Sequence, residues 1–528
     1  MAIKILISDS LAEEGVSILK KQKNFKVDIK TKLTPEELKK IIGDYNVLIV
    51  RSQTKVTKDI IKSAKKLKYI GRAGVGLDNV DVEEASKHGI IVMNAPGGNT
   101  ISTAEHAFSL IMSLARNIPQ ANASLKRGEW ARKKFLGVEL YGKTLGIIGL
   151  GRIGGEVAKR ALSFAMKVVA YDPFLIPERA KSLGIESVDL NTLFKKSDYI
   201  TVHAPLKEDT RYIIGEKSFK KMKKGVRIIN CARGGIVDEN ALARAIEEGS
   251  IAGAALDVYE KEPPGQTKLI TMDKVIATPH LGASTEEAQI NVAIDIANSI
   301  KDAVMKKGIR NAVNVPSIEP ELYAIIEPYL ILAEKMGSMH AQLIEGYVNK
   351  VKIKYVGDII KYNLNHMTRS IVKGLLEPVL EENVNYVNAL VIAGERGIKI
   401  TEEKTKEIED FANLISIEVE SDKMKNLIAG TLFTKIDPRI VKINKFYIDA
   451  VPEGHMLVIY NQDKAGIVGQ IGTILGESGI NIAGMNFGRA KAGGEAITVL
   501  NVDSEVPQNV LSKIKKARYI KEVKQVRP

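Results

Sequence analysis

One short stretch constrains the fold of this chain more than any other. It reads TLGIIGLGRIGGEVAKRALSFAMKVVAYDP and runs from Thr144 to Pro173. A β-rich apolar run is followed by a glycine-rich turn, a helical pattern and a second apolar run that ends at Asp172. This order is typical of one strand–helix–strand unit in a parallel sheet.

The glycine turn has the spacing G-x-G-x-x-G, with Gly149, Gly151 and Gly154. The first glycine permits a tight turn, the second lets a pyrophosphate approach the backbone, and the third lets the helix pack closely on the strand. The free N–H groups at the helix start, around Arg152 and Ile153, and the helix dipole favour a phosphate there. Because the required strand and helix flank the turn, the stretch predicts dinucleotide binding.

Asp172 ends the second strand of this unit. Its distance from the glycine turn along the chain matches the spacing at which dinucleotide-binding units carry an acid. A carboxylate at this place accepts both ribose hydroxyls of NAD and repels the 2′-phosphate of NADP. We therefore expect NAD to be the cofactor.

Four more β-like runs follow, and polar residues stand where they end. Ligands of such sheets bind at the carboxyl ends of the strands. The residues at these ends are His203, Arg233, Asp257, Glu262 and His280. A histidine such as His280 can take a hydroxyl proton while hydride leaves the same carbon. Glu262 could bind the other ring nitrogen, and Arg233 could bind a substrate carboxylate through two parallel bonds. A lone strand-end histidine is commonly structural, and the combination with an NAD fingerprint favours catalysis.

The segments NCARGGIVDE, ALDVYEKEPP and TPHLGAST carry a resemblance to a known family. They resemble the signature segments of the D-isomer-specific 2-hydroxyacid dehydrogenases. The resemblance implies that Arg233, Glu262 and His280 are catalytic and that Asp257 binds the nicotinamide carboxamide. It also places His203 and Cys231 among the cofactor-binding residues, with Cys231 on the adenine side; the alternative for Cys231 is a small buried core residue.

The resemblance also explains why the fingerprint comes late in the chain. The N-terminal part alternates strand and helix without G-x-G-x-x-G. In the family this unit is the substrate domain, and the cofactor domain is inserted into it. We expect an α/β protein with a Rossmann-type NAD domain (98–290) inserted in a flavodoxin-like substrate domain (1–97 and 291–316). The segments 101–117 and 285–308 are expected to be the two crossing helices, with the active site in the cleft between the domains.

The segments VRSQTKVT and GRAGVGLDNVD resemble the phosphoglycerate dehydrogenase branch of this family. That branch implies 3-phosphoglycerate as the substrate. Arg51 and Arg72 would bind its phosphate, since guanidinium suits phosphate geometry. The backbone at Val75 and Gly76 would bind its carboxylate. The alternative for Arg51 is a surface ion pair.

The chain continues beyond residue 316 with two more expected domains. Residues 453–528 have the order βαββαβ, which is ferredoxin-like and resembles an ACT domain, a regulatory module that binds amino acids. The resemblance implies L-serine as effector, bound by Asp463 and Asn481, although Ala465 replaces the usual proline of the loop. The alternative is a purely structural dimerisation module. Residues 317–452 resemble the α+β intervening domain of the long enzymes, which are homotetramers.

Composition limits the other classes of function. The 528 residues carry a net charge of +14, but the lysines are scattered rather than gathered, so we expect no nucleic-acid partner. The chain shows neither a membrane span nor a signal peptide, and we expect no membrane partner. Its one cysteine excludes an internal disulfide and a cysteine-based zinc cage, we expect no bound metal, and the cytoplasm is the expected compartment.

Two alternatives to the phosphoglycerate substrate remain open. One is a dehydrogenase of the same family acting on another acid, such as glyoxylate or 2-hydroxyglutarate. The other is an NADH-sensing corepressor on the same fold. The serine-type C-terminal domain and the absence of a compact basic patch favour an enzyme over the corepressor.

Overall fold

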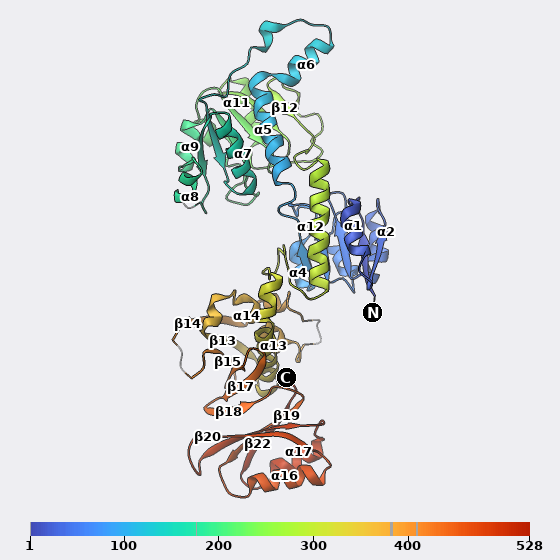
Figure 1. Cartoon of the computed structure of the whole chain (residues 1–528), viewed down its shortest axis with the longest axis vertical. Helices are drawn as coiled ribbons and strands as arrows, with labels where there is room; N and C mark the ends of the chain where they lie inside the picture. The colour runs from blue at the N-terminus through green and yellow to red at the C-terminus, as the bar shows by residue number, and fades with distance from the viewer. Residues whose placement is uncertain (1, 176, 381–383, 408–409) are drawn as a thin grey trace.

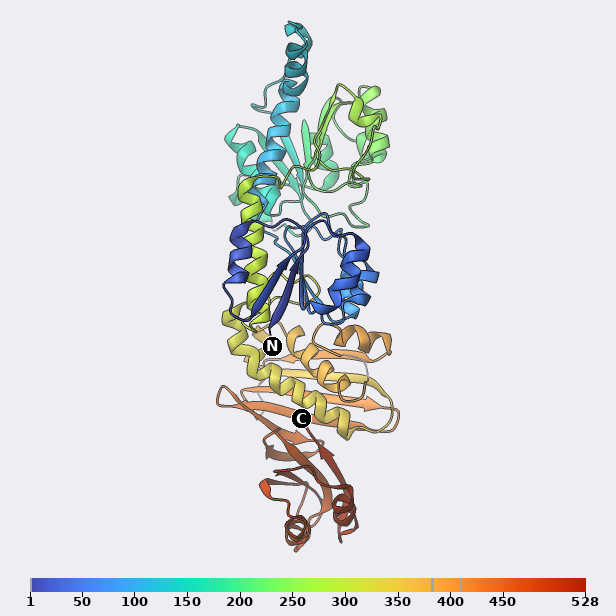
Figure 2. The same ribbon diagram turned by 90° about the vertical axis from the view of Figure 1, so that its right-hand side faces the viewer.

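The computed structural model describes residues 2–175, 177–380, 384–407 and 410–528. Four sheets follow one another along the long axis of the molecule (Figure 1). The inserted nucleotide-type sheet lies at one end and the C-terminal sheet at the other, and the N-terminal sheet and the intervening sheet lie between them (Figures 1 and 2). This confirms the expected α/β class with two additional C-terminal sheets.

The N-terminal sheet has five parallel strands in the order β2-β1-β3-β4-β5. This is the flavodoxin order, as expected. The strands are β1 (Ile3–Ile7), β2 (Phe25–Ile29), β3 (Val47–Val50), β4 (Tyr69–Arg72) and β5 (Ile91–Met93). The helices between them are α1 (Glu13–Lys20), α2 (Pro35–Ile41), α3 (Lys58–Ser63) and α4 (Val82–Lys87).

The second sheet has seven parallel strands in the order β12-β11-β10-β9-β6-β7-β8, the doubly wound order of a dinucleotide-binding sheet. Its strands are β6 (Thr144–Ile148), β7 (Lys167–Tyr171), β8 (Glu186–Ser187), β9 (Tyr199–Val202), β10 (Val226–Asn230), β11 (Ile251–Leu256) and β12 (Val275–Ala277). Its helices include α7 (Arg152–Ser163), α8 (Pro177–Ser182), α9 (Leu190–Lys196), α10 (Glu216–Phe219) and α11 (Glu239–Glu247). The edge strand β8 is too short to leave a sequence pattern.

Two long helices join these sheets, as the sequence predicts. Helix α5 (Thr100–Arg116) leaves the N-terminal sheet and packs on α7 of the second sheet. Helix α12 (Glu286–Val304) returns and packs on α1. A short helix, α6 (Ile118–Lys126), projects beyond the second sheet (Figure 1). The carboxyl ends of strands from both sheets therefore meet between α5 and α12.

The intervening region forms a mixed sheet of six strands covered by helices. The strand order is β14-β13-β15-β16-β17-β18. The strands are β13 (Val348–Gly357), β14 (Lys399–Thr405), β15 (Asn413–Ser421), β16 (Lys425–Phe433), β17 (Asp437–Ile443) and β18 (Phe446–Ala450). The helices are α13 (Pro320–Leu343), α14 (Asn365–Leu376) and α15 (Ala389–Glu395).

The C-terminal sheet has the expected βαββαβ order. The elements are β19 (His455–Gln462), α16 (Ile467–Glu477), β20 (Ile482–Arg489), β21 (Glu495–Val502), α17 (Gln508–Lys516) and β22 (Ile520–Val526). Leu457 and Ile459 of β19 face the two helices, whereas the alternating Met456 and Val458 belong to the core of the intervening region. The largest apolar core thus crosses residue 452, and the two C-terminal sheets share it.

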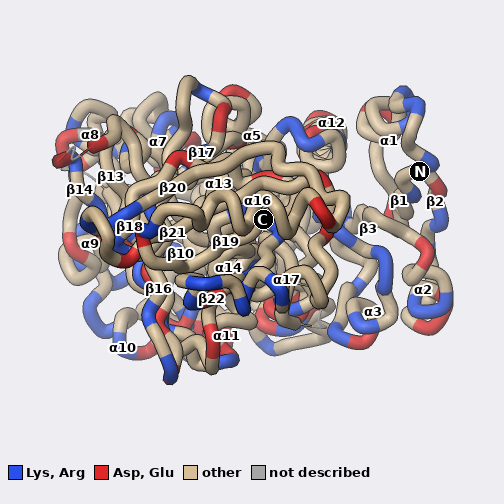
Figure 3. The backbone as a smooth tube through the Cα atoms, turned by 90° about the horizontal axis from the view of Figure 1, so that it is seen from below, with Lys and Arg blue, Asp and Glu red and all other residues tan. Residues whose placement is uncertain are grey.

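None of the helices in the described ranges combines the length and apolar character needed to cross a bilayer. Acidic and basic residues are intermixed along the chain seen from the C-terminal end (Figure 3). The described residues contain no group of three or more His, Cys, Asp or Glu side chains that could hold a metal ion.

Candidate active site

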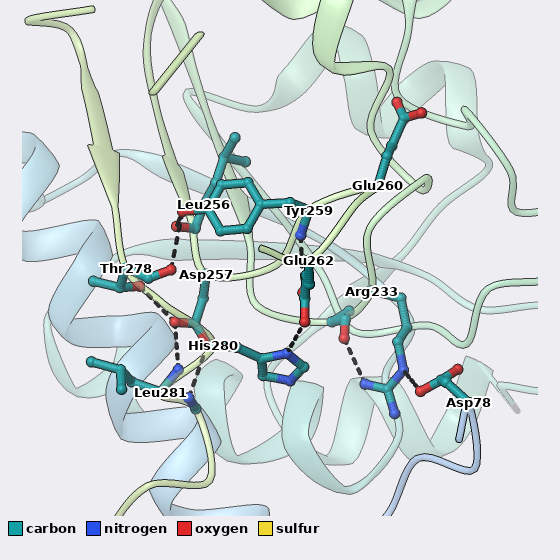
Figure 4. A network of polar contacts seen from close by, with 12 residues as sticks. Asp78, Arg233, Leu256, Asp257, Tyr259, Glu260, Glu262, Thr278, His280 and Leu281 are labelled. Carbon is teal, nitrogen blue, oxygen red and sulfur yellow. Dashed lines mark hydrogen bonds and ion pairs between the residues drawn. The ribbon is translucent and has the colours of Figure 1, made fainter. Parts of the chain in front are cut away.

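The centre of the candidate site is a hydrogen-bonded pair, His280 and Glu262. His280 Nδ1 lies 2.8 Å from Glu262 Oε2, and the backbone N–H of Tyr259 donates to Glu262 Oε1 over 3.2 Å (Figure 4). The His280 side chain is half exposed. Since one ring nitrogen is bonded to Glu262, the other is left to act on a ligand, and the pair can accept a proton.

His280 is held in an unusual backbone conformation. Its φ is +56°, in the left-handed region that residues other than glycine rarely adopt. Such conformations cost on the order of 1–3 kcal/mol and persist where the surroundings determine them, commonly at functional sites.

Arg233 reaches the loop after β4 of the other sheet. Its Nε lies 3.2 Å from Asp78 Oδ2 (Figure 4), and a Cβ on Gly76 would lie 2.1 Å from Arg233 Nη2. The glycine therefore allows the guanidinium to approach the backbone closely. Within the described hydrogen bonds, the N–H groups of Val75 and Gly76 have no acceptor. Arg233 and these N–H groups, from two different sheets, are together suited to a carboxylate.

Two further arginines lie on the N-terminal sheet side. Arg51 Nη1 donates to the carbonyl of Ser10 over 3.3 Å, but its buried Nε has no partner among the described atoms. The Nε of Arg72 is likewise buried and unpaired in the described region. Burial, and then the positive charge of Arg233, lowers the pKa of Arg72 to about 10. Three guanidinium groups in electrostatic reach of one another, two of them with unused donors, favour an anionic ligand.

The glycine turn has the geometry that its spacing predicts. Gly149 has a φ of +92°, and a Cβ there would meet the carbonyl of His203 at 2.7 Å. A Cβ on Gly154 would lie 2.2 Å from the Gly149 oxygen, whereas one on Gly151 would meet no heavy atom within 4 Å. Gly149 and Gly154 are thus required by close packing inside the protein, and Gly151 leaves open space beside the backbone where a pyrophosphate can approach.

Asp172 lies beside this turn. Its two carboxylate oxygens accept the backbone N–H groups of Leu150 and Phe174, each over 2.9 Å. A cleft of about 480 Å³ lies between the start of α7 and Asp172, with Phe174 at its edge. The open backbone at Gly151 and the carboxylate across the cleft fit NAD. Arg152 lines this cleft at the start of α7, and its Nη1 donates to the Pro96 carbonyl over 3.2 Å.

The comparisons with known proteins agree with this geometry. Residues 108–282 match the model of the D-isomer specific 2-hydroxyacid dehydrogenase NAD binding domain, 325–444 that of the D-3-phosphoglycerate dehydrogenase intervening domain, and 455–518 that of the ACT domain. The D-3-phosphoglycerate dehydrogenase of Methanocaldococcus jannaschii is 48% identical over 522 residues, which cover 99% of each chain. That of Archaeoglobus fulgidus is 47% identical over 97% of this chain and 98% of its own.

The chain belongs to the D-3-phosphoglycerate dehydrogenase family. A solved structure, the D-lactate dehydrogenase from Aquifex aeolicus complexed with NAD and lactic acid, is 30% identical and superposes with a TM-score of 0.52. That match covers 57% of this chain and 96% of the other. This structure and the match to the NAD-binding family model together confirm that the cofactor is NAD.

In this family member Asp257 lies beside the His280 turn and is held there by protein partners. The residue is fully buried, and its carboxylate accepts hydrogen bonds from Thr278 Oγ1 (2.6 Å), Leu281 N (2.8 Å) and Gly282 N (2.9 Å) (Figure 4). His106 Nε2 is a fourth contact at 3.1 Å. Although burial opposes it, the hydrogen bonds from His106 and Thr278 hold the pKa of Asp257 below its ordinary value. The carboxylate thus holds the turn around His280 in place.

The two remaining cofactor candidates are largely enclosed. His203 Nε2 contacts Thr201 Oγ1 over 3.0 Å, while its buried Nδ1 has no partner among the described atoms. Burial lowers the pKa of His203 to about 4, so the ring is neutral. Cys231 is 6% exposed in the apolar core, and burial raises the pKa of its thiol. The buried position of Cys231 matches the alternative interpretation, in which it is a small core residue.

Two positions in the site carry no sequence signal that singles them out. Tyr259 is buried, and its hydroxyl lies 3.1 Å from the Leu256 carbonyl and 3.0 Å from the Thr278 carbonyl. It therefore bridges the ends of β11 and β12, the strands that lead to Glu262 and His280. His106 lies on α5, far from Asp257 in the chain. Tyr259 lies within the ALDVYEKEPP segment, and this membership is the hint that the sequence offers for it.

The expected effector residues are not brought together within one chain. Asp463 Oδ2 accepts from Gly493 N (3.0 Å) and Arg489 Nη1 (3.2 Å), near the start of β21. Asn481 Nδ2 donates to Asp503 Oδ2 over 2.8 Å, just past the end of β21. Because β21 pairs along its whole length with β19 and β20, the two residues lie at opposite ends of this strand.

Proposed function

We propose that this protein oxidises D-3-phosphoglycerate to 3-phosphohydroxypyruvate with NAD, the first step of L-serine biosynthesis. Relatives with this name, identical at 44–48% over nearly the whole chain, support the activity. The observation that carries the proposal is the His280–Glu262 pair beside Arg233, with Arg51 and Arg72 in reach of the same anionic ligand. When bound, NAD supplies the acceptor for the hydride that leaves C2 of the substrate.

In this proposal each residue acts on a defined part of the substrate. His280 takes the proton of the C2 hydroxyl, and Glu262 orients the ring and stabilises its charged form. Arg233 and the N–H groups of Val75 and Gly76 bind the carboxylate. The guanidinium groups of Arg51 and Arg72 bind the phosphate.

The cofactor would be held by the residues around the glycine turn. We propose that its pyrophosphate lies against Gly149, Gly151 and Gly154 and the N–H groups of α7, with its ribose on Asp172. We propose a hinge at residues 97/98 and 290/291, with Arg51, Arg72, Val75 and Gly76 on one side and the cofactor residues on the other. Separate apolar cores on the two sides support such a hinge.

The direct test measures NADH formation from 3-phosphoglycerate, with and without added L-serine. Turnover is expected, and so is its decrease with serine. Absence of turnover in both directions, with 3-phosphohydroxypyruvate and NADH also tried, would contradict the activity. NADH binding without turnover would favour the corepressor alternative.

The Arg51→Gln variant tests the substrate class. We expect kcat/KM for 3-phosphoglycerate to fall about 10- to 100-fold, because a charged hydrogen bond to phosphate contributes about 1.5–3 kcal/mol. Turnover of small 2-ketoacids that lack a phosphate should change little. An equal loss on both kinds of substrate would contradict the phosphate role and favour another 2-hydroxy acid.

We also propose a homotetramer with L-serine bound between ACT domains. The separation of Asp463 from Asn481 supports this, since one small ligand can contact both only if two chains contribute. Exposed apolar residues after α5 support a second contact between chains; they are Trp130, Leu136 and Tyr141. Equilibrium sedimentation should give a tetramer, and Asn481→Ala should remove the serine effect without loss of turnover. The cytoplasm is the proposed compartment.

A further inference from the structure

Helix α5 contacts the turn that carries His280 through two side chains. Thr103 Oγ1 donates to the Gly282 carbonyl over 3.0 Å. One turn further along, His106 Nε2 lies 3.1 Å from Asp257 Oδ1 and 3.2 Å from Thr278 Oγ1. Residues three apart share a face of a helix, so one face of α5 is bonded to the catalytic turn.

Asp257 is the group through which this contact reaches His280. Its two oxygens bind the residues on both sides of His280: Thr278 before it, and Leu281 and Gly282 after it. The Asp257 side chain is buried, so any donor it loses cannot be replaced by bulk water without opening the site. The place of the carboxylate therefore determines the direction of the His280 ring.

Among the described contacts of Asp257, His106 is the donor that comes from outside the β11 and β12 strand ends. The other donors belong to residues 278–282 and move with that turn. His106 belongs to the helix that joins the two halves of the cleft and packs on α7. It therefore fixes Asp257, and with it the turn, relative to the helix that packs on the cofactor-binding helix α7.

We propose that His106 is a positioning residue for the oxidation: through Asp257 it fixes the His280 turn to helix α5. The proposal rests on the proposed function, in which His280 is the base. His106 acts on the orientation of that base and contacts no reacting atom. Its loss should therefore lower the rate of the chemical step and leave binding nearly intact.

The test compares His106→Ala and His106→Gln with the wild-type enzyme. For the alanine variant we expect kcat to fall at least tenfold, with KM for 3-phosphoglycerate and Kd for NADH within about twofold. The glutamine variant should recover part of the rate, because its amide N–H can donate to Asp257. The control is His88→Ala, at the partly exposed end of α4, which should behave as wild type.

Three results would overturn the proposal. One is an unchanged kcat in the alanine variant. The second is a parallel change of kcat, KM and NADH affinity together with a lowered unfolding temperature, which would indicate general destabilisation. The third is an alanine variant and a glutamine variant that are equally slow.

A readout without substrate separates this proposal from the proposed function. Selective ¹⁵N labelling of the seven histidines makes their ring nitrogens observable by NMR through the carbon-bound ring protons, including the His280 Nδ1 that contacts Glu262. The chemical shift of this Nδ1 signal should differ between the wild-type protein and His106→Ala. An unchanged signal overturns the positioning role, whatever acid the enzyme oxidises. A shifted signal in His106→Ala, found together with a wild-type enzyme that fails to oxidise 3-phosphoglycerate, contradicts only the proposed function.

Discussion

The proposed catalytic pair Glu262 and His280 is brought together by the ends of two neighbouring strands. Glu262 follows β11 and His280 follows β12, and these two strands are neighbours in the sheet. The Tyr259 hydroxyl binds carbonyl groups at both ends, and its N–H binds Glu262. The contact between base and carboxylate is therefore set by the backbone, not by flexible side chains alone.

The His280→Asn variant tests the base at this scale. The kcat for 3-phosphoglycerate oxidation should fall by roughly 10²–10⁴-fold, the contribution typical of general acid–base catalysis. NADH affinity, measured by fluorescence titration, should stay within about twofold of the wild-type value, since the imidazole acts on the C2 hydroxyl of the substrate and not on the cofactor. His88→Asn is the matched control. A variant with near wild-type kcat would show that another group takes the proton.

At the scale of helices, α13 and α14 approach each other more closely than side chains would allow. A Cβ on Gly337 would lie 2.1 Å from the Ile371 carbonyl oxygen, and one on Gly374 would lie 2.0 Å from the Glu334 carbonyl oxygen. Each glycine thus allows the backbone of one helix to contact the other. The geometry of this helix pair depends on both positions.

Gly337→Ala should therefore destabilise the protein. We expect a loss of about 1–3 kcal/mol, because a methyl group there forces the helices apart. Gly394 of α15 is the control, since a Cβ there would meet nothing within 4 Å. Gly394→Ala should stabilise by about 0.5–1 kcal/mol through helix propensity. Urea unfolding of the two variants measures the change in the free energy of unfolding, which should be negative for Gly337→Ala and positive for Gly394→Ala. An unchanged free energy for Gly337→Ala would contradict the close contact.

The same two helices contain buried histidines. Burial lowers the pKa of His340 to about 3 and that of His366 to about 4, so both rings are neutral in the folded protein. In the unfolded chain they take up protons near pH 6.5. The contribution of these two rings to stability should be constant above that pH and fall as the pH decreases from 6.5 toward 4, by up to about 2.7 kcal/mol per pH unit. In His340→Leu the slope from pH 6.5 to 5 should be lower than that of the wild type by about 1.4 kcal/mol per pH unit, as unfolding of both proteins at each pH would measure. An unchanged slope contradicts the assignment.

At the scale of the whole molecule, the two C-terminal sheets behave as one body. Their common core includes Met456, Val458, Ile497 and Val499 beyond residue 452. The contact of this body with the N-terminal sheet is smaller: Val387 inserts into the N-terminal core, and Asn385 Nδ2 donates to the Gly89 carbonyl over 3.1 Å. The boundary at residue 452 therefore lies within one apolar core, which the two C-terminal sheets share. The boundary near residue 316 lies between that core and the core of the N-terminal sheet.

Truncation tests this division. A chain that ends at residue 452 should aggregate on expression, because it exposes the apolar face that the ACT sheet covers. A chain that ends at residue 316 loses the contact around Val387 and the two backbone bonds between Ile309 and Ile318, and it should remain folded and bind NADH. Light scattering and NADH fluorescence measure the two outcomes. A monodisperse protein ending at residue 452 would contradict the shared core.

The local sequence determined the sheet order and the nearness of the main site residues. Strand–helix alternation, the glycine spacing and strand-end polar residues predict both parallel sheets and the meeting of Arg233, Glu262 and His280, because parallel strands all end at one edge. The βαββαβ order of the C-terminal domain is predicted in the same way.

Tertiary structure alone decided the rest. The short strand β8, the burial of Asp257 and the contact of His106 with it depend on segments far apart in the chain, and local patterns do not encode which buried donor meets which acceptor. Asp463 and Asn481 share a motif in sequence, yet the full pairing of β21 places them at its opposite ends. The shared C-terminal core arises because each face of an amphipathic sheet must be covered, and the sequence shows that a face is apolar without showing what covers it.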